Sequence, residues 1–340
     1  MDKIKVTSWN IEHLRKVTGD LDSQNLIKRK EGIIQELNEI NPDILCIVEG
    51  SNNEHEMEQF ISDVFGDKKK LIKAINQDYE QRGTQYIWFV VDKKYYENCK
   101  LQPTEIWKSY TGCDNWDVNY WGEFSTKKHR YYRHPQVLLF EFRGHKIDLI
   151  GLHLKSKFLY PGWQGDWNAG GQKKEKVIRE ALEARIKLAT EAIDVRKYIN
   201  KRFEQVPYPG IFVMGDLNDG PGKELFENQY LFFDLVSNIQ GDIFQADKYL
   251  NHALFDYKKN LRWSVYFEDI ITPDRDPHIL LDHIFFTQGL VNGKLPLQIN
   301  ENAGYIEHEI HDYLNSSLNY YQKTSDHKPI SVVIDIAEEE

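Results

Sequence analysis

The chain has 340 residues, and its 41% hydrophobic and 13% aromatic content is sufficient for a large buried core. A formal net charge of -10 disfavours a nucleic-acid binder that relies on overall charge, although a carboxylate cluster neutralised by a divalent cation would account for part of it. Its three cysteines, Cys46, Cys99 and Cys113, are isolated and odd in number, which argues against a disulfide framework and a C-x-x-C zinc site.

The chain offers no apolar stretch long enough to span a membrane, and its N-terminus enters a strand-like pattern instead of an apolar secretory segment. We therefore expect a cytoplasmic protein with no membrane span. No linker rich in Pro, Gly or Ser interrupts the sequence, so residues 1–340 are predicted to form a single domain. The sequence leaves the oligomeric state open, with a monomer favoured.

The first half of the chain alternates strands and helices. IKVTSWNI is typical of a strand, and Ser23 is placed to cap a helix that runs to Ile40 and stops before Pro42. DILCIVE is predicted as a buried strand and EHEMEQFISDVF as a short helix. QYIWFVVD, VLLFEF and KIDLIGLHL follow as strands, separated by polar or Gly/Pro signals.

The second half opens with a stripe of apolar residues that predicts a long helix from about Gln172 to Phe203. PGIFVMGDLN, LLDHIFFT and PISVVIDI are predicted as later strands. Consecutive strands often have no helix between them. This pattern favours an α/β fold of two packed sheets flanked by helices over one doubly wound sheet.

Two segments do not fit a core. Residues 107–134 mix aromatic side chains with bases, and residues 158–171 are rich in Trp and Gly. They are either substrate loops, whose aromatics stack on nucleobases while Lys and Arg meet phosphates, or long loops packed by their own aromatics. The sequence gives both interpretations equal weight. The substrate-binding residues under the first interpretation are Trp121, Lys127, Lys128, Arg130 and Arg133.

Carboxylate and amide side chains stand where apolar runs end. A divalent cation helps hydrolysis at an anionic phosphorus centre, and hard cations such as Mg²⁺ take oxygen ligands. Glu49, at the end of DILCIVE, and Asn10, at the end of a neighbouring strand, suit that role. For Glu49 alone, a solvated carboxylate at the end of a strand is the commoner explanation. Only the other polar motifs of the chain favour a metal site.

The motif GDLND follows the apolar run IFVM. If the strand stays extended, Asp216 and Asn218 share a face. Asp216 would then orient or deprotonate the attacking water, and Asn218 would donate to a phosphate oxygen. An Asp/Asn/Gly turn explains the motif equally well.

The motif TSDHKPI opens a C-terminal core strand with Asp326 and His327, which turn chemistry alone does not explain. His327 would be a general base or a transition-state donor if a carboxylate held its other ring nitrogen, and Asp282 of LLDHIFF is the candidate for that carboxylate. A buried histidine is more often a satisfied core residue. The two Asp-His steps, at 282–283 and 326–327, weaken that explanation.

A further histidine pair occurs in HEIHD at 308–312. It lacks the H-E-x-x-H spacing of zinc proteases. We therefore interpret these histidines as polar residues on the surface instead of ligands of a zinc site.

WN in the first strand, a strand ending in Glu, HLKS, GDLND, LDHIF and SDHKPI occur in an order that resembles the endonuclease/exonuclease/phosphatase superfamily, typified by deoxyribonuclease I and exonuclease III. The resemblance covers essentially the whole chain. It implies a four-layer α-β-β-α sandwich of two mixed sheets and hydrolysis of a phosphoester that depends on Mg²⁺ or Mn²⁺.

Matched motif by motif, the resemblance implies a metal site in which Glu49 is the main ligand, Asn10 lies beside it and Asp326 lies near the metal or its waters. His153 of HLKS would contact a phosphate or leaving group, and Lys155 of the same motif is expected on the substrate side.

The resemblance also implies that Asp216 and Asn218 orient water and that Asp282 polarises His327. Arg133 is similar to a substrate-side Arg of some members. Thr84 and Gln85 stand where deoxyribonuclease I-like members carry a carboxylate that orients the first histidine, so the likeness does not extend to a general-acid role for His153.

The leading functional hypothesis is a metal-dependent nuclease with DNA or RNA as substrate. The alternative is a phosphatase or phosphodiesterase of inositol phosphates, phospholipid head groups or nucleotides, which has the same chemistry in a more closed anion pocket. The basic and aromatic segment 107–134 favours the nuclease. A catalytically silent binding module would have lost one of four residues that this chain retains, namely Glu49, Asp216, Asp282 and His327.

Overall fold

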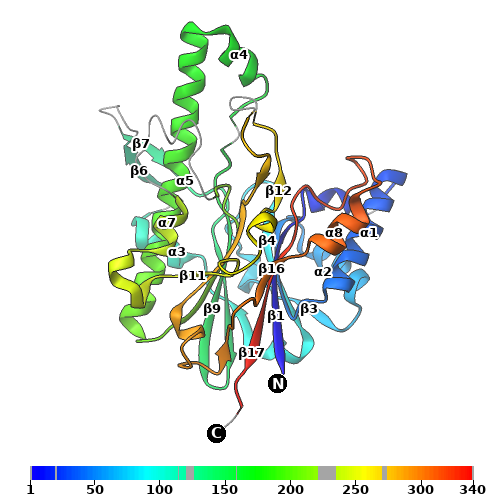
Figure 1. The fold of residues 1–340 in the computed structure, drawn as a ribbon, viewed down its shortest axis with the longest axis vertical. Coiled ribbons are helices and arrows are strands. Elements are labelled where there is room, and N and C mark those ends of the chain that lie inside the picture. Colours follow the sequence, from blue (N-terminus) through cyan, green and yellow to red (C-terminus); the bar gives the residue numbers. More distant parts are fainter. Residues whose placement is uncertain are drawn as a thin grey trace.

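Two mixed β-sheets pack face to face, and helices cover the outer side of each (Figure 1). The computed structural model describes residues 2–19, 21–113, 115–119, 126–157, 159–220, 235–269 and 274–338. Trp121, one of the predicted substrate-binding residues, lies outside these ranges. The arrangement confirms the predicted sandwich of two sheets between layers of helices.

The first sheet has the strand order β15-β17-β1-β2-β4-β3, with β16 also paired to β17. Its central strand β1 (Lys3–Asn10) runs parallel to β2 (Ile44–Gly50) and antiparallel to β17 (Ile330–Ile336). The other strands are β3 (Lys69–Leu71), β4 (Tyr86–Asp92), β15 (Leu297–Gln298) and β16 (Gly304–Ile306). Because β1 and β2 are parallel, both point their carboxyl ends at one edge of the sheet.

The second sheet has the order β11-β14-β10-β9-β8-β5. Here β9 (His145–His153) and β10 (Gly210–Asp216) are parallel, and β14 (Asp282–Phe286) is antiparallel to β10. The remaining strands are β5 (Cys99–Leu101), β8 (Gln136–Phe142) and β11 (Asn251–His252). Two short hairpins lie outside both sheets: β6 (Trp116–Asn119) with β7 (Thr126–His129), and β12 (Val265–Tyr266) with β13 (His278–Ile279).

Helices form the two outer layers (Figure 1). On the side of the first sheet are α1 (Gln24–Ile40), α2 (Glu54–Phe65) and α8 (His308–Asn315). On the side of the second sheet are α3 (Glu105–Thr111), α5 (Gly171–Gln205) and α7 (Leu235–Gln240). A short helix, α4 (Trp163–Ala169), packs against the beginning of α5. The long helix and α2 therefore occur where the apolar periodicity predicts them.

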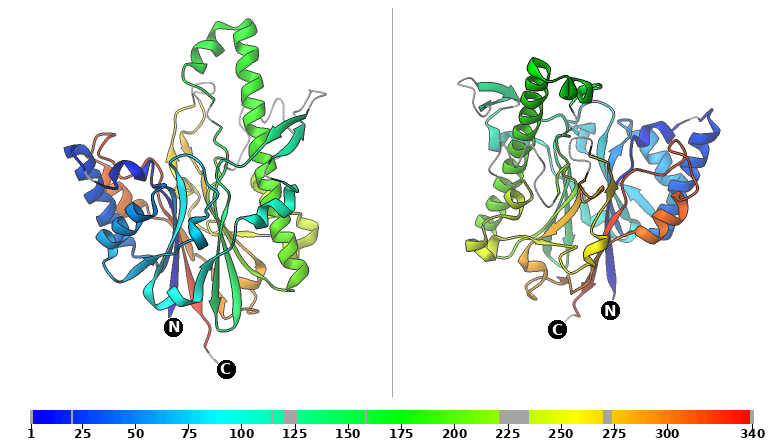
Figure 2. Two further views of the ribbon diagram at one scale, coloured as in Figure 1. Left: turned by 180° about the vertical axis from the view of Figure 1, so that it is seen from behind. Right: turned by 45° about the horizontal axis from the view of Figure 1, so that its top comes forward.

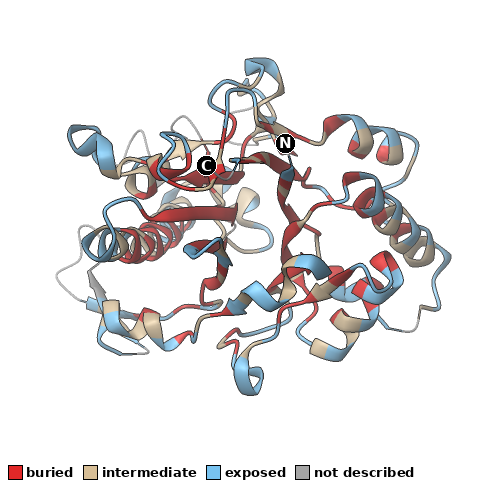
Figure 3. Cartoon of the chain, turned by 90° about the horizontal axis from the view of Figure 1, so that it is seen from below, coloured by how far each residue is buried: buried red, intermediate tan, exposed pale blue. Residues whose placement is uncertain are grey.

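The core is continuous between the sheets and extends under the helices, as the buried strands in Figure 3 show. Phe89 and Ile47 of the first sheet belong to the same apolar cluster as Phe140, Phe212 and Met214 of the second. A second cluster joins the outer face of the second sheet to α5. Burial of this apolar surface is the main force that holds the two sheets at a fixed distance.

The two aromatic segments pack on the protein itself to a large extent. Trp107 and Tyr131 are buried in the cluster under α5, where the Trp107 indole donates to the carbonyl of Pro135. Trp163 and Trp167 pack against the buried Val177 and the residues around it on α5. These aromatic side chains therefore pack within the protein, as the second interpretation of the two segments expects.

The interpretation of the HEIHD histidines as polar surface residues is wrong. His308 and His311 on α8 are buried, and each has a polar partner. The His311 ring bonds to Glu36 of α1 at 2.8 Å, and His308 contacts the Lys328 amine at 3.0 Å. The pattern is explained by a helix whose buried face is polar.

Among the described residues, no helix is long and apolar enough to cross a membrane.

Gly215 shows how closely the strands that carry the polar residues approach each other. Its φ is +133°, and a Cβ atom there would lie 2.0 Å from the carbonyl oxygen of Leu152 on β9. We expect Gly215→Ala to lower the free energy of unfolding by about 3 kcal/mol or more, because it combines backbone strain with a clash that the backbone cannot relieve. Urea denaturation followed by circular dichroism measures this.

Gly293 is the matched control. It also has a positive φ, +73°, but a Cβ atom added there would meet no other atom within 4 Å. Gly293→Ala should therefore cost only the backbone term, about 1 kcal/mol. Equal losses in the two variants would show that the close approach at Gly215 does not matter.

Candidate active site

Polar side chains from both sheets meet where the strands end. His153, Asp216 and Asp282 are direct cross-strand neighbours on β9, β10 and β14, since Asp216 is in register with each of the other two. Cross-strand neighbours project from the same face of a sheet. Asn10 at the end of β1 reaches them from the first sheet, and its Nδ2 donates to Asp216 Oδ2 at 3.1 Å. One hydrogen bond thus joins the polar ends of the two sheets.

Glu49 completes this group from β2. The His153 Nε2 atom lies 3.7 Å from Glu49 Oε1 and 3.7 Å from Asp216 Oδ2. Glu49 has a left-handed backbone, with φ 62°, at an irregularity in the pairing of β2 with β4. Such strained conformations persist only where surrounding contacts hold them. Here the backbone N–H of His13 donates to Glu49 Oε2 at 3.0 Å, and the Gln85 amide contacts the same oxygen.

Asp216 and Asn218 come together through a turn, not along an extended strand. The strand β10 ends at Asp216, and Asn218 has a φ of 54°. The Asn218 backbone N–H donates to Asp216 Oδ1 at 2.8 Å, while its side-chain amide donates to Asp216 Oδ2 and to the carbonyl of Leu154. The expectation that an extended strand aligns the two residues is therefore corrected. This turn brings the side chains of Asp216 and Asn218 into contact with each other.

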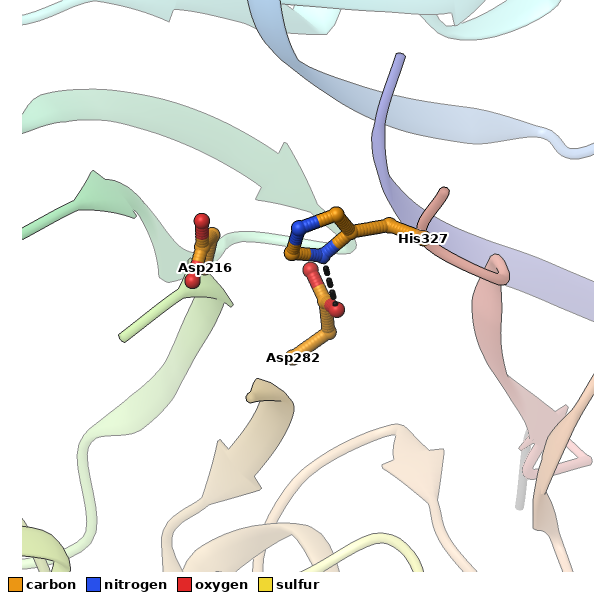
Figure 4. Close-up of side chains that lie close together, drawn as sticks. All are labelled: Asp216, Asp282 and His327. Atoms are coloured by element: carbon orange, nitrogen blue, oxygen red, sulfur yellow. Dashed lines mark hydrogen bonds and ion pairs between the residues drawn. The ribbon is translucent and has the colours of Figure 1, made fainter. Parts of the chain in front are cut away.

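His327 precedes β17 and lies across from this row (Figure 4). Its Nδ1 bonds to Asp282 Oδ2 at 2.7 Å, as the sequence predicts for a carboxylate that holds the ring. Ser264 Oγ accepts from the backbone N–H of Asp282 at 3.1 Å, and the Trp9 indole donates to the carbonyl of His327 at 2.9 Å. Single ligand atoms of Asp216, Asp282 and His327 lie within 4.8 Å of one another.

Burial and mutual charge set the protonation of the group. Burial by itself lowers the pKa of His327, but the charge of Asp282 and its hydrogen bond outweigh burial and raise this pKa to about 10. Burial raises the pKa of Asp216 to about 7, against the opposing charge of His327. Burial, followed by the charge of Arg133, holds the pKa of His153 well below its ordinary value. At neutral pH His153 is therefore neutral and His327 is charged.

Gln85 replaces the carboxylate that the family resemblance leads one to expect. Its Oε1 accepts from Arg133 Nη2 at 2.5 Å, and its amide turns toward Glu49 and His13. The Nδ1 of His153 is buried without a hydrogen-bond partner among the described residues. Gln85 therefore links Arg133 to Glu49 instead of orienting His153.

The other predicted residues occupy three places. Asp326 is exposed beside His327, and Lys155 follows β9, where its backbone N–H donates to Glu191 Oε2 at 2.9 Å. The basic residues of the predicted substrate loop lie on or next to β7, where Lys127 pairs with Glu183 of α5 at 3.6 Å and Lys128 with Asp117 at 3.0 Å. The third of them, Arg130, is exposed just after this strand.

Sequence reasoning missed His13, Ser264 and Glu191, and it named Gln85 only as a residue in the place of an expected carboxylate, without a role of its own. Gln85 carried a signal, as a polar residue ahead of an aromatic strand. Glu191 carried none, because a buried glutamate on a long helix has the same pattern as a solvated one.

Two buried oxygens make the group suitable for a hard cation. Asn10 Oδ1 and Asp282 Oδ1 have no hydrogen-bond partner among the described residues. Asn10 Oδ1 belongs to the residue that bridges the two sheets, and Glu49 directly follows Val48, the cross-strand partner of Asn10. Unsatisfied buried acceptors are costly and uncommon, and carboxylate and amide oxygens of this kind are the ligands that hard cations take.

Structural comparison identifies the same fold in known proteins. TDP2 from Caenorhabditis elegans superimposes with a TM-score of 0.52 at 14% identity, over 98% of this chain and 97% of that one. TDP2 from D. rerio, solved in complex with a single-strand DNA product, gives 0.51 at 14% identity, over 98% and 100%. An endonuclease/exonuclease/phosphatase family protein from Bacteroides thetaiotaomicron gives 0.48 at 10% identity, over 99% of each chain. No family model and no curated protein matches the sequence. The two TDP2 structures confirm the expected fold.

The Asp282–His327 pair makes a testable prediction about pH. The folded pKa of His327, about 10, is above its ordinary value of 6.5, so the pair stabilises the folded protein fully below pH 6.5 and loses this effect as the pH rises through about 10. In chelator, we expect the His327 ring to remain protonated at pH 8 by NMR, and in Asp282→Asn to be neutral there.

Urea midpoints at pH 6 and pH 9 provide the second readout. The difference between the two midpoints should shrink in Asp282→Asn, because the charge that raises the pKa of His327 is gone. A His327 ring that is already neutral at pH 8 in the unmodified protein would contradict the assignment.

Proposed function

We propose that the protein is a divalent-metal-dependent phosphoester hydrolase, and specifically a nuclease that cleaves phosphodiester bonds of DNA or RNA by activated water. One observation carries the proposal. Two sheets bring Asn10 and Glu49 to the row His153, Asp216 and Asp282, with the charged His327 ring held across that row. Residues from five strands and one loop converge without a purely structural reason to do so.

Glu49 and Asn10, with Asp326 at the exposed side, would hold Mg²⁺ or Mn²⁺. Their oxygen atoms suit such ions, and the unpartnered Oδ1 of Asn10 supports this placement. When bound, the cation would neutralise charge on the phosphate and on the departing oxygen. The contacts from His13 and Gln85 fix Glu49 Oε2, so the position of the carboxylate does not depend on the ligand.

The chain's own residues supply the proton chemistry. Asp216, with a pKa of about 7, can accept a proton from a water molecule near neutral pH, and Asn218 holds its carboxylate in place. His327, charged and fixed by Asp282, donates a hydrogen bond where negative charge develops on the phosphate. Neutral His153 is limited to hydrogen bonding with the substrate. Of the two roles considered for His327, the donor role agrees with its charge.

A nucleic-acid substrate is supported by the surroundings of this group. Arg133 donates to Gln85, whose amide contacts Glu49 of this group. The centre of the exposed Tyr132 ring lies 5.1 Å from the Arg133 guanidinium carbon. Arg pairs well with phosphates, and aromatic rings stack on bases. The D. rerio TDP2 structure, which has the same fold, contains a single-strand DNA product. A catalytically silent binding module would not need the complete set of acidic and imidazole groups.

Activity on a generic diester tests the proposal. With bis(p-nitrophenyl) phosphate or a labelled oligonucleotide, we expect hydrolysis with Mg²⁺ or Mn²⁺ and none in chelator. Glu49→Gln and His327→Ala should each lower kcat by about 10² to 10⁴-fold, because each removes a group that acts on the reacting phosphate. Circular dichroism should show both variants folded.

Glu58→Gln on α2 is the matched control. Glu58 is partly exposed and pairs with Lys73 at 2.5 Å, and it takes no part in the contacts described above for the group around Asp216, so the activity of this variant should equal that of the unmodified protein. Full activity in Glu49→Gln or His327→Ala would contradict the assigned roles. Turnover of inositol phosphates or nucleoside monophosphates without any turnover of oligonucleotides would replace the nuclease with a phosphatase.

A further inference from the structure

Positive charge is concentrated in two segments of this acidic chain. Residues 126–133 carry four basic and no acidic side chains, and residues 157–187 carry seven basic and four acidic ones. Together these segments have a net charge of +7. Since the whole chain has -10, the remainder has -17. A polyanion responds to such a local field and not to the summed charge.

The two segments are neighbours in space. The hairpin β6–β7 lies beside α5 in Figures 1 and 2, and Lys127 of β7 contacts Glu183 of α5 at 3.6 Å. We call residues 126–130 together with residues 159–187 the basic arm, which carries nine basic and four acidic side chains and so a net charge of +5. It comprises β7, α4 and the first half of α5.

The basic arm projects beyond the sheets on the side of the candidate active site (Figure 1). Glu191 of α5 accepts from the backbone of Lys155, two residues after His153, so this part of the helix is level with the strand ends. From Glu191 back to Gly171 the helix rises roughly 30 Å at 1.5 Å per residue. That length matches roughly nine nucleotides of a duplex strand at 3.4 Å each.

The packing of α4 makes the arm a stable support. Trp163 and Trp167 bury Val177 and Ala181 between the two helices. The basic side chains remain outside: Lys173, Lys176 and Arg179 are exposed. The Lys176 amine lies over the Tyr160 ring at 4.5 Å, and the Lys174 amine over the Trp167 ring at 4.2 Å. Amines next to half-exposed aromatic rings suit a polynucleotide, because the amines can bind its phosphates and the rings can stack on its bases.

We propose that the basic arm binds a polynucleotide strand that extends from the scissile phosphate, so that the protein prefers long substrates to short ones. This inference rests on the proposed function for the position of the cut, whereas binding by the arm does not require catalysis. A small phosphorylated ligand would be contained within the group around Asp216 and would not reach the arm. The reach and the charge of the arm therefore favour a polymer.

The test is binding of a fluorescein-labelled 20-nucleotide DNA strand in EDTA, followed by anisotropy at several salt concentrations. In the triple variant Lys173→Glu, Lys176→Glu and Arg179→Glu we expect at least tenfold weaker binding in 0.1 M salt. The slope of log K against log salt should become shallower by about 2, because three phosphate contacts are lost. Acidic residues near a helix N-terminus are favourable, so α5 should remain folded.

The matched control reverses three exposed lysines at the opposite ends of the strands: Lys93→Glu, Lys100→Glu and Lys146→Glu. It makes the same change in net charge and should retain the affinity and the salt slope. Hydrolysis of bis(p-nitrophenyl) phosphate should be unchanged in both triple variants, because neither touches the group around Asp216.

Unchanged oligonucleotide affinity and slope in the arm variant, or an equal loss in the control variant, would overturn the inference. So would binding by the arm to phosphatidylserine vesicles with no binding to the oligonucleotide. If the unmodified protein hydrolyses no diester but binds the oligonucleotide through the arm, the proposed function fails while the binding inference stands.

Discussion

Two hydrogen bonds, one from Asn10 to Asp216 and one between His327 and Asp282, join the polar strand ends of one sheet to those of the other, and the site depends on them. Apolar packing between the sheets fixes their separation. Asn10 and Glu49 lie at the carboxyl ends of the parallel strands β1 and β2, and His153 and Asp216 lie at the carboxyl ends of β9 and β10. At the separation set by the core, these two pairs of strand ends face each other. Residues more than 200 positions apart in the chain thereby become neighbours.

Gathering acidic groups in a buried place is costly unless opposite charge accompanies them. The fold supplies part of that charge through His327, whose bond to Asp282 raises its pKa, and through Arg133 behind Gln85. Buried oxygens of Asn10 and Asp282 remain without partners among the described residues. The proposed cation and the proposed anionic substrate would supply the partners that these groups lack.

Much of the fold could be predicted because the signals are local. The apolar periodicity of α2 and α5 and the continuous apolar runs of the central strands identify those elements directly. The short strands β3, β5, β15 and β16 have no such signal, since two or three residues form a strand only when a neighbouring strand is present. Among the site residues, motif order indicated Asp282 as the partner of His327. It could not show that Gln85 turns toward Glu49, or that Asp216 and Asn218 meet through a turn, because both depend on contacts between distant segments.

We propose that the strand ends of both sheets form one metal-dependent site. Anomalous diffraction from crystals grown with Mn²⁺ would locate the ion and so test this proposal. We expect an ordered Mn²⁺ ion bound by Glu49 and by Asn10 Oδ1. Another carboxylate cluster, Asp78, Glu80 and Glu105, lies elsewhere on the surface and offers an internal comparison. Mn²⁺ at that cluster, with none at Glu49 and Asn10, would contradict the account.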